Sequence, residues 1–176
     1  MKNRISLSKR RGARGFSMIE LLVAVLVMGI GVLGITGLQM VSLQNNRGAL
    51  TRADAVQLAY DILDRMRANP GAAYAGLAIG AAPPVTVDCQ AATCTEAQMA
   101  TFDQAVWKCS LGNWNNNVNC VPIRNGVILP LGTAQPGLPS GDGSIAVNGG
   151  GIVTITVQWQ EPNQPAVTTI SIDSQG

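Results

Sequence analysis

The sequence predicts an α+β fold. A long N-terminal helix, first apolar and then amphipathic, is expected to pack against a small antiparallel β-sheet head that carries a second short helix. Three observations predict it. The segment 21–44 contains no charged residue. The segment 42–69 repeats apolar residues at helical spacing. The segment 152–172 holds two alternating apolar runs separated by a turn that contains two prolines.

A short basic leader precedes the apolar run. Residues 1–15 contain six basic residues and no acidic one: Lys2, Arg4, Lys9, Arg10, Arg11 and Arg14. One carboxylate, Glu20, then lies inside the apolar segment. A charged carboxylate at the centre of a membrane helix costs about 2.5–3.5 kcal/mol on insertion scales, and less near an end. An acid in this position therefore indicates a function that supplies it with a partner.

The apolar run is long enough to remain as a membrane anchor. It extends from Phe16 to about Leu43, whereas the apolar part of a secretory signal has about 7–15 residues. About 20 apolar residues cross a bilayer. The basic leader predicts that residues 1–15 stay cytoplasmic and that the C-terminal part is exported. Ordinary signal cleavage at Ala53-Asp54-Ala55 is not expected, because charged residues precede it.

Gly15, Phe16 and Glu20, between the basic leader and the apolar run, resemble the class III leader of the type IV pilin and pseudopilin superfamily. The resemblance implies that a prepilin peptidase cleaves between Gly15 and Phe16 and N-methylates Phe16. It also implies that Glu20 pairs with the freed α-amine of a neighbouring subunit. Pairing with the amine of the same chain, one helical turn away, and simple hydration at the headgroup boundary are the alternatives.

The order of parts over the whole chain most resembles the minor pilin called type IV pilus modification protein PilV. The resemblance rests on the Cys94–Met99 opening of the second helix and on the strand Val153–Trp159. It implies a minor pilin that joins other minor pilins and the major pilin, and that primes pilus assembly. The protein would be a single-pass inner-membrane protein with a periplasmic head, and later part of the pilus fibre at the cell surface.

Two other functions remain open. A minor pseudopilin of a type II secretion system shares the leader and the helix. A membrane-anchored binding module would instead use Trp107, Trp114 and Trp159 as a ligand surface. Trp107 and Trp159 fall on or beside apolar faces, which favours core packing, so Trp114 in an Asn-rich loop is the one plausible contact residue.

The domain boundaries follow from these segments. We expect a leader at 1–15, an assembly helix at 16–44, an amphipathic half at 45–69 and an α+β head at 70–176. Asn69-Pro70-Gly71 ends the helix. Its core-facing stripe is predicted from 4-3-4-3 spacing, with a narrower second patch at Leu58 and Ile62. The stripe contains Ala49, Ala53, Val56, Tyr60, Leu63 and Met66 or Arg67.

Within the head, Thr95 and Gln98 form a capping box that opens a second helix, expected to end at 110–112. Its inward face is predicted at Met99, Phe102, Val106 and Cys109. Residues 70–94 and 130–151 are expected to be loops. One or two short strands are expected at 118–129, around an Asn125-Gly126 turn. The segments 152–160 and 166–172 form a β-hairpin.

Four cysteines follow the apolar run, which suits an oxidising compartment. Three connectivities are possible. The pairs Cys89–Cys94 and Cys109–Cys120 are favoured because they close the shortest loops. Each would add a few kcal/mol of stability. The cysteine spacing is a poor match to structural zinc sites.

Composition argues against several function classes. The formal net charge is +2, but without the leader six basic residues face ten acidic ones, a net charge of −4. The head therefore lacks the clustered cations of a nucleic-acid-binding face. The chain has no histidine, the commonest general base and metal ligand. The sequence predicts neither an enzyme nor a cofactor or metal site.

Overall fold

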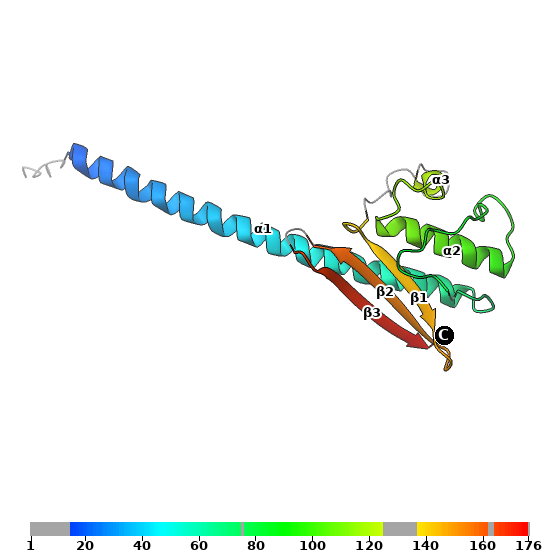
Figure 1. Cartoon of the computed structure of the whole chain (residues 1–176). Helices are drawn as coiled ribbons and strands as arrows, with labels where there is room; N and C mark the ends of the chain where they lie inside the picture. Colours follow the sequence, from blue (N-terminus) through cyan, green and yellow to red (C-terminus); the bar gives the residue numbers. More distant parts are fainter. Residues whose placement is uncertain (1–14, 75, 125–136, 162–163, 176) are drawn as a thin grey trace, which may run out of the picture. The chain divides into compact units, whose positions relative to one another are not determined.

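The computed structural model describes residues 15–74, 76–124, 137–161 and 164–175. The elements in chain order are α1 (Met18–Ala68), α2 (Glu96–Leu111), α3 (Val121–Arg124), β1 (Asp142–Val147), β2 (Ile152–Gln160) and β3 (Val167–Gln175) (Figure 1). The predicted α+β class is confirmed. The chain divides into two compact units, Met1–Asn45 and Asn46–Gly176. The leader apart from Gly15, and the Asn125-Gly126 turn, lie outside the described residues.

The described part of the first unit is the apolar beginning of α1. It forms a helix because no proline interrupts it and, beyond the first turn, each backbone N–H can bond to a carbonyl within the helix. Its most apolar 18-residue window has a mean hydropathy of 2.6, and none of it is buried. Among the described helices, α1 alone is long and apolar enough to cross a membrane. Such a surface requires an apolar surrounding from outside the chain.

In the second unit, the rest of α1 buries Ala55, Ala59, Ile62 and Leu63. Ala55 and Ala59 have no exposed surface, because their small side chains let the rest of the head approach the helix closely. The predicted stripe is therefore wrong over most of its length, apart from Leu63 at its end and a half-buried Met66. Ala49, Ala53, Val56 and Tyr60 are exposed.

The 4-3-4-3 spacing predicted the wrong face because apolar residues recur on two neighbouring sides of α1, and spacing alone does not tell which side the head covers. Val56 is 38% exposed and Tyr60 48%. The buried face is instead the neighbouring side of the helix, which contains the predicted second patch, Leu58 and Ile62. An uncovered apolar stripe is consequently left on α1, and we call Ala49, Ala53, Val56 and Tyr60 the α1 stripe from here on.

The sheet is antiparallel throughout, in the order β1-β2-β3. The predicted hairpin is confirmed, with Ile155 opposite Ile172 and Val157 opposite Ile170. Side chains alternate along β2, so that one face enters the core with α1 and α2. That face consists of Val153, Ile155, Val157 and Trp159.

Strand β1 lies in a segment that was predicted to be loop, so that prediction is wrong for Asp142–Val147. The glycine content of this segment suggested a loop. Gly143, however, serves close packing: a Cβ there would approach Cη2 of Trp107 to 2.6 Å. The strands predicted at 118–129 are also wrong where the structure describes them, because turns and the short helix α3 occupy 118–124.

Helix α2 begins as predicted. Thr95 caps it, and both hydrogen bonds of the capping box with Gln98 are present. The helix has two buried faces, because the head packs on both sides of it. One face joins the main core, and the other forms a second cluster with α3. The first face contains Ala100, Trp107 and Leu111, and the second Phe102, Ala105, Val106 and Cys109.

The structure pairs Cys89 with Cys94 and Cys109 with Cys120, with Cα–Cα distances of 5.5 and 5.4 Å. The second disulfide joins the end of α2 to the start of α3 inside the second cluster. The first closes a tight loop before α2. Both lie in the second unit, where little regular structure holds the connections between elements.

The buried face of α1 can be tested by introducing leucine at two positions about one helical turn apart, one of them buried and the other exposed. Ala59→Leu overpacks a site with no free surface and should cost about 1–3 kcal/mol of unfolding free energy. The matched control Val56→Leu adds leucine on the exposed stripe and should change it by less than about 0.5 kcal/mol. Urea unfolding of the full chain in detergent measures both. A larger loss in the control would mean that the stripe, and not Ala59, faces the core.

Candidate functional site

The N-terminal site residues lie at the beginning of α1. Gly15 and Phe16 immediately precede the helix, and Phe16 is 78% exposed. Ser17 starts the helical hydrogen bonding, because its carbonyl accepts from the N–H groups of Glu20 (3.0 Å) and Leu21 (3.2 Å).

Glu20 thereby falls in the first turn of α1. A carboxylate near a helix N-terminus interacts favourably with the helix dipole. Its side chain is exposed. The structure thus places the one acid of the apolar segment at the end of the helix next to Phe16, on the surface of its own unit. There it is accessible to groups from outside the chain.

The head contains a buried ion pair that the sequence did not predict. Lys108 of α2 has no exposed surface and Asp142 of β1 only 2%. Their charged atoms, Nζ and Oδ1, lie 2.5 Å apart. Lys108 also donates to the carbonyls of Ala78 (2.9 Å) and Gly143 (2.6 Å). The pair therefore fixes α2 against β1 and against the connecting loop.

Three other groups donate to the Asp142 carboxylate besides Lys108. The backbone N–H groups of Gly80 (2.7 Å) and Gly143 (2.8 Å) donate to its carboxylate, and so does Nε1 of Trp114 (3.2 Å). Burial lowers the pKa of Lys108, which the Asp142 carboxylate partly offsets. Burial also opposes ionisation of Asp142, but the hydrogen bonds from Lys108, Gly80 and Gly143 outweigh it and hold its pKa below the usual value. A buried ion pair with this many hydrogen bonds suits a structural role.

A second polar network joins the end of α1 to α2. Arg65 donates to Asp61 (2.9 Å) and to Asp103 (3.2 Å). Tyr74, from the loop after α1, donates its hydroxyl to Asp103 at 2.7 Å. Burial, together with this hydrogen bond, raises the pKa of Tyr74 to about 12. These contacts hold the amphipathic half of α1 at a fixed rotation within the head.

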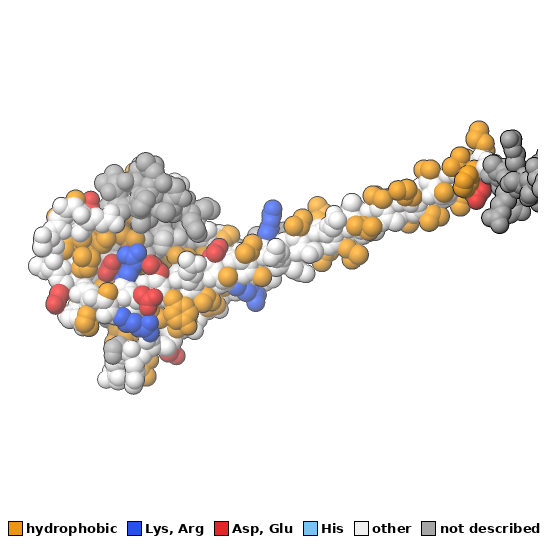
Figure 2. Space-filling view, turned by 180° about the vertical axis from the view of Figure 1, so that it is seen from behind, with side chains coloured by type: hydrophobic (Ala, Val, Ile, Leu, Met, Phe, Trp, Pro, Cys, Tyr) orange, Lys and Arg blue, Asp and Glu red, His pale blue; other side chains and the backbone are white. Residues whose placement is uncertain are grey.

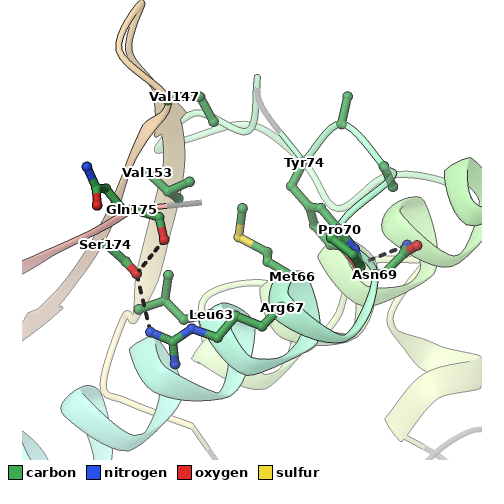
Figure 3. A pocket seen from close by; sticks show the side chains of 13 residues that line it. Leu63, Met66, Arg67, Asn69, Pro70, Tyr74, Val147, Val153, Ser174 and Gln175 are labelled. Carbon is green, nitrogen blue, oxygen red and sulfur yellow. Dashed lines mark hydrogen bonds between the residues drawn. The ribbon is translucent and has the colours of Figure 1, made fainter.

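An apolar pocket of about 380 Å³ lies where the last turns of α1 meet the strand ends (Figure 3). Most lining side chains are apolar, including Leu63, Met66 and Val153. Its charged residue, Arg67, donates to Ser174 (3.3 Å) and pairs with Asp64 (2.9 Å). With its cation already paired, the pocket offers apolar contact and no charge-selective ligand site among its described residues.

The three tryptophans do not form a ligand surface. Trp107 and Trp159 are completely buried. Trp107 donates to the carbonyl of Leu58 at 2.8 Å, which fixes α2 on α1. Trp114 is half-buried, packs against the second cluster and donates to Asp142. The binding-module interpretation therefore loses its proposed contact residues.

The described residues contain no group of three or more His, Cys, Asp or Glu side chains that could hold a metal ion. Figure 2 shows hydrophobic side chains along the apolar part of α1 and a few paired charges on the visible face of the head. The exposed apolar side chains of α1 are therefore a candidate contact surface.

Two family models match the chain in adjacent segments. Residues 10–36 match the prokaryotic N-terminal methylation motif, and residues 37–105 match type IV pilin Tt1218. Both matches support the type IV pilin superfamily. No curated protein and no solved structure matches the chain.

Pilins are structural subunits of filaments. The N-terminal methylation motif covers Gly15, Phe16 and Glu20, and it implies processing by a prepilin peptidase and assembly with other pilins. Together with the apolar helix, it indicates membrane anchoring before assembly. The fold described above, with one long helix and a small antiparallel sheet, is consistent with the pilin fold.

Sequence reasoning missed Lys108 and Asp142 because neither residue has a local signal. Lys108 is one of two cations after Pro70, and it entered the sequence analysis only in the count of charges. The available clue was its position: it follows Trp107 and precedes Cys109 on a helix that is apolar on both sides. A cation there requires a buried counter-charge, which only the tertiary structure supplies.

Replacing the buried carboxylate tests this pair. Asp142→Asn leaves the Lys108 charge buried without a counter-charge and should cost about 3–5 kcal/mol of unfolding free energy. The matched control Asp64→Asn removes one partner of an exposed pair and should cost less than about 1 kcal/mol. Urea unfolding of the full chain in detergent measures both losses. Equal losses would contradict a special role for the buried pair.

The same pair predicts a pH dependence. Because folding lowers the pKa of Asp142, its contribution is present above its ordinary pKa of 3.8 and is lost as the pH falls through the lower folded value. The difference in melting temperature between wild type and Asp142→Asn should therefore be largest above about pH 4 and narrow below it. A difference that stays constant down to pH 2 would show that Asp142 does not titrate with unfolding.

Proposed function

We propose that this chain is a minor type IV pilin that joins other minor pilins and primes pilus assembly. The observation that carries the proposal is the position of Glu20, a lone exposed carboxylate in the first turn of a helix that is otherwise uncharged as far as Gln44. The resemblance of the head to PilV-type minor pilins supports the minor rather than the major role.

Processing would create the partner that Glu20 needs. Cleavage between Gly15 and Phe16 frees an α-amine one helical turn from the carboxylate, and the peptidase then methylates it. In a filament the amine of a neighbouring subunit reaches Glu20, because the apolar helices pack side by side. Pairing in this low-dielectric environment offsets the cost of burying either charge and sets the axial register of the subunits.

Before assembly, the proposed topology has residues 1–15 in the cytoplasm, the apolar part of α1 in the inner membrane and the head in the periplasm. The two disulfides of the head suit that compartment. No catalytic residue, cofactor or metal takes part in this function. The partners are the prepilin peptidase, other minor pilins, the major pilin and the inner membrane.

Substitution of the carboxylate tests the proposal. Glu20→Ala and Glu20→Lys should still insert in the membrane but should be lost from sheared pili, because neither can pair with an incoming amine. The matched control is Thr36→Ala, whose hydroxyl is satisfied inside the helix by the Leu33 carbonyl at 2.8 Å and should not matter. Immunoblots of the membrane and sheared-pilus fractions measure how much of each variant has been incorporated into pili.

Wild-type recovery of both Glu20 variants in sheared pili would refute the proposed pairing. Absence of the wild-type chain from sheared pili, combined with loss of enzyme secretion on deletion of its gene, would instead identify a minor pseudopilin of a type II secretion system. The leader and the apolar helix fit both assemblies, so this fractionation decides between them.

A further inference from the structure

The two edges of the sheet differ. The outer edge of β1 is partly covered, because Ile145 donates its N–H to the carbonyl of Leu77 at 2.8 Å and the carbonyl of Gly143 accepts from Lys108. Strand β3 forms the other edge, on the side of the sheet away from α2 (Figure 1). Its pairing with β2 runs through nine consecutive residues without a bulge.

The hydrogen bonds show which β3 groups point outward. Asn148 donates to the carbonyl of Ile152, so even-numbered residues of β2 face β1 and odd-numbered residues face β3. In the β2–β3 register, even-numbered residues of β3 then bond to β2. The N–H and C=O groups of Thr169, Ser171 and Asp173 therefore point away from the sheet, with no backbone partner in the described part of the chain.

Natural edge strands usually carry a lysine, a proline or a bulge that prevents further pairing. Strand β3 has none of these over Val167–Gln175. It is rich in Thr, Ile and Ser and has one charged residue, Asp173, whose carboxylate accepts from the Thr154 hydroxyl at 2.7 Å. The edge is thus open for a further strand.

The α1 stripe lies next to this edge. Arg67 reaches Ser174 of β3, so that side of α1 faces the β3 edge. Tyr60 and Val56 precede Arg67 by seven and eleven residues, which is about two and three helical turns, and so lie on the same side. The opposite side of α1 is occupied by α2, through the contact of Trp107 with the Leu58 carbonyl. The stripe is exposed and contains no charged residue.

We propose that an extended segment of another pilin subunit adds to β3 as a fourth strand and covers the α1 stripe. A strand paired with β3 lies about 4.8 Å beyond it. Because this distance is only about half the width of a helix, the added strand lies beside the α1 stripe. Alternate side chains of that strand would face Val56 and Tyr60 and must be apolar, whereas the others face water and are polar. The inference rests on the proposed function, because it requires neighbouring pilin heads.

A second copy of this chain cannot pair with the β3 edge through its own β3 and also cover the α1 stripe. Two β3 edges paired antiparallel about a twofold axis would direct the head portions of the two α1 helices in opposite directions, whereas the subunits of a pilus share one polarity under the proposed function. A parallel pair about a twofold axis along the strands would place the second α1 on the opposite face of the sheet. A strand from a different subunit satisfies the open backbone groups and the stripe together.

The test removes one outward N–H. Ser171→Pro deletes a donor that β2 does not use, so the β2–β3 ladder remains. The matched control Ser171→Ala loses the same side-chain contact with Thr156 and keeps the N–H. The measured quantity is the amount of the full-length chain in sheared pili divided by the amount in the membrane. We expect this ratio to fall about tenfold for the proline variant, because the lost N–H leaves a carbonyl of the added strand buried and unpaired. The alanine variant should leave the ratio unchanged.

Equal recovery of both variants would overturn the proposal, and so would an equal loss, which would implicate the side chain. If the proline variant does not fold in detergent, hydrogen exchange on the wild-type chain decides. The amides of Thr169, Ser171 and Asp173 should exchange more slowly in pili than in detergent. Unchanged exchange would overturn the proposal, because it would show that no strand pairs with β3 in pili. Absence of the wild type from pili would contradict the proposed function itself.

Discussion

The proposed assembly depends first on the pairing requirement of Glu20. Its carboxylate lies in the first turn of a helix whose next 24 residues carry no charge. Neither a bilayer nor a helical filament core hydrates such a group well, so a cation must be supplied nearby. Under the proposed function, cleavage before Phe16 would supply that cation. One proteolytic event would then make the chain competent to pair.

The head keeps one side of α1 covered and leaves another side free. Small residues, Ala55 and Ala59, allow close approach on the covered side, and the contact from Trp107 to the Leu58 carbonyl fixes the rotation of the helix. The buried Lys108–Asp142 pair locks α2 and β1 together. A rigidly held helix presents the same stripe and the same sheet edge to every neighbour, which is what a subunit of a regular assembly requires.

Sequence reasoning succeeded where local signals dominate. The uncharged run, the Thr95 capping box and the alternation in β2 each specify an element by themselves. It failed where tertiary packing decides. Strand β1 contains Gly143, whose role is to accommodate Trp107. Helix α1 has two neighbouring apolar sides, and only the packed head selects the one that contains Ala59 and Ile62. The Lys108–Asp142 pair was missed for the same reason, since its partners come from separate elements.

The most direct test of the account is mass spectrometry of the N-terminal peptide of the native protein. The account predicts a mature chain that begins at Phe16 and carries one additional methyl group on its α-amine. A chain that still begins at Met1, or one that begins after Ala55, would contradict it, because Glu20 would then have no freed amine to pair with or would itself have been removed.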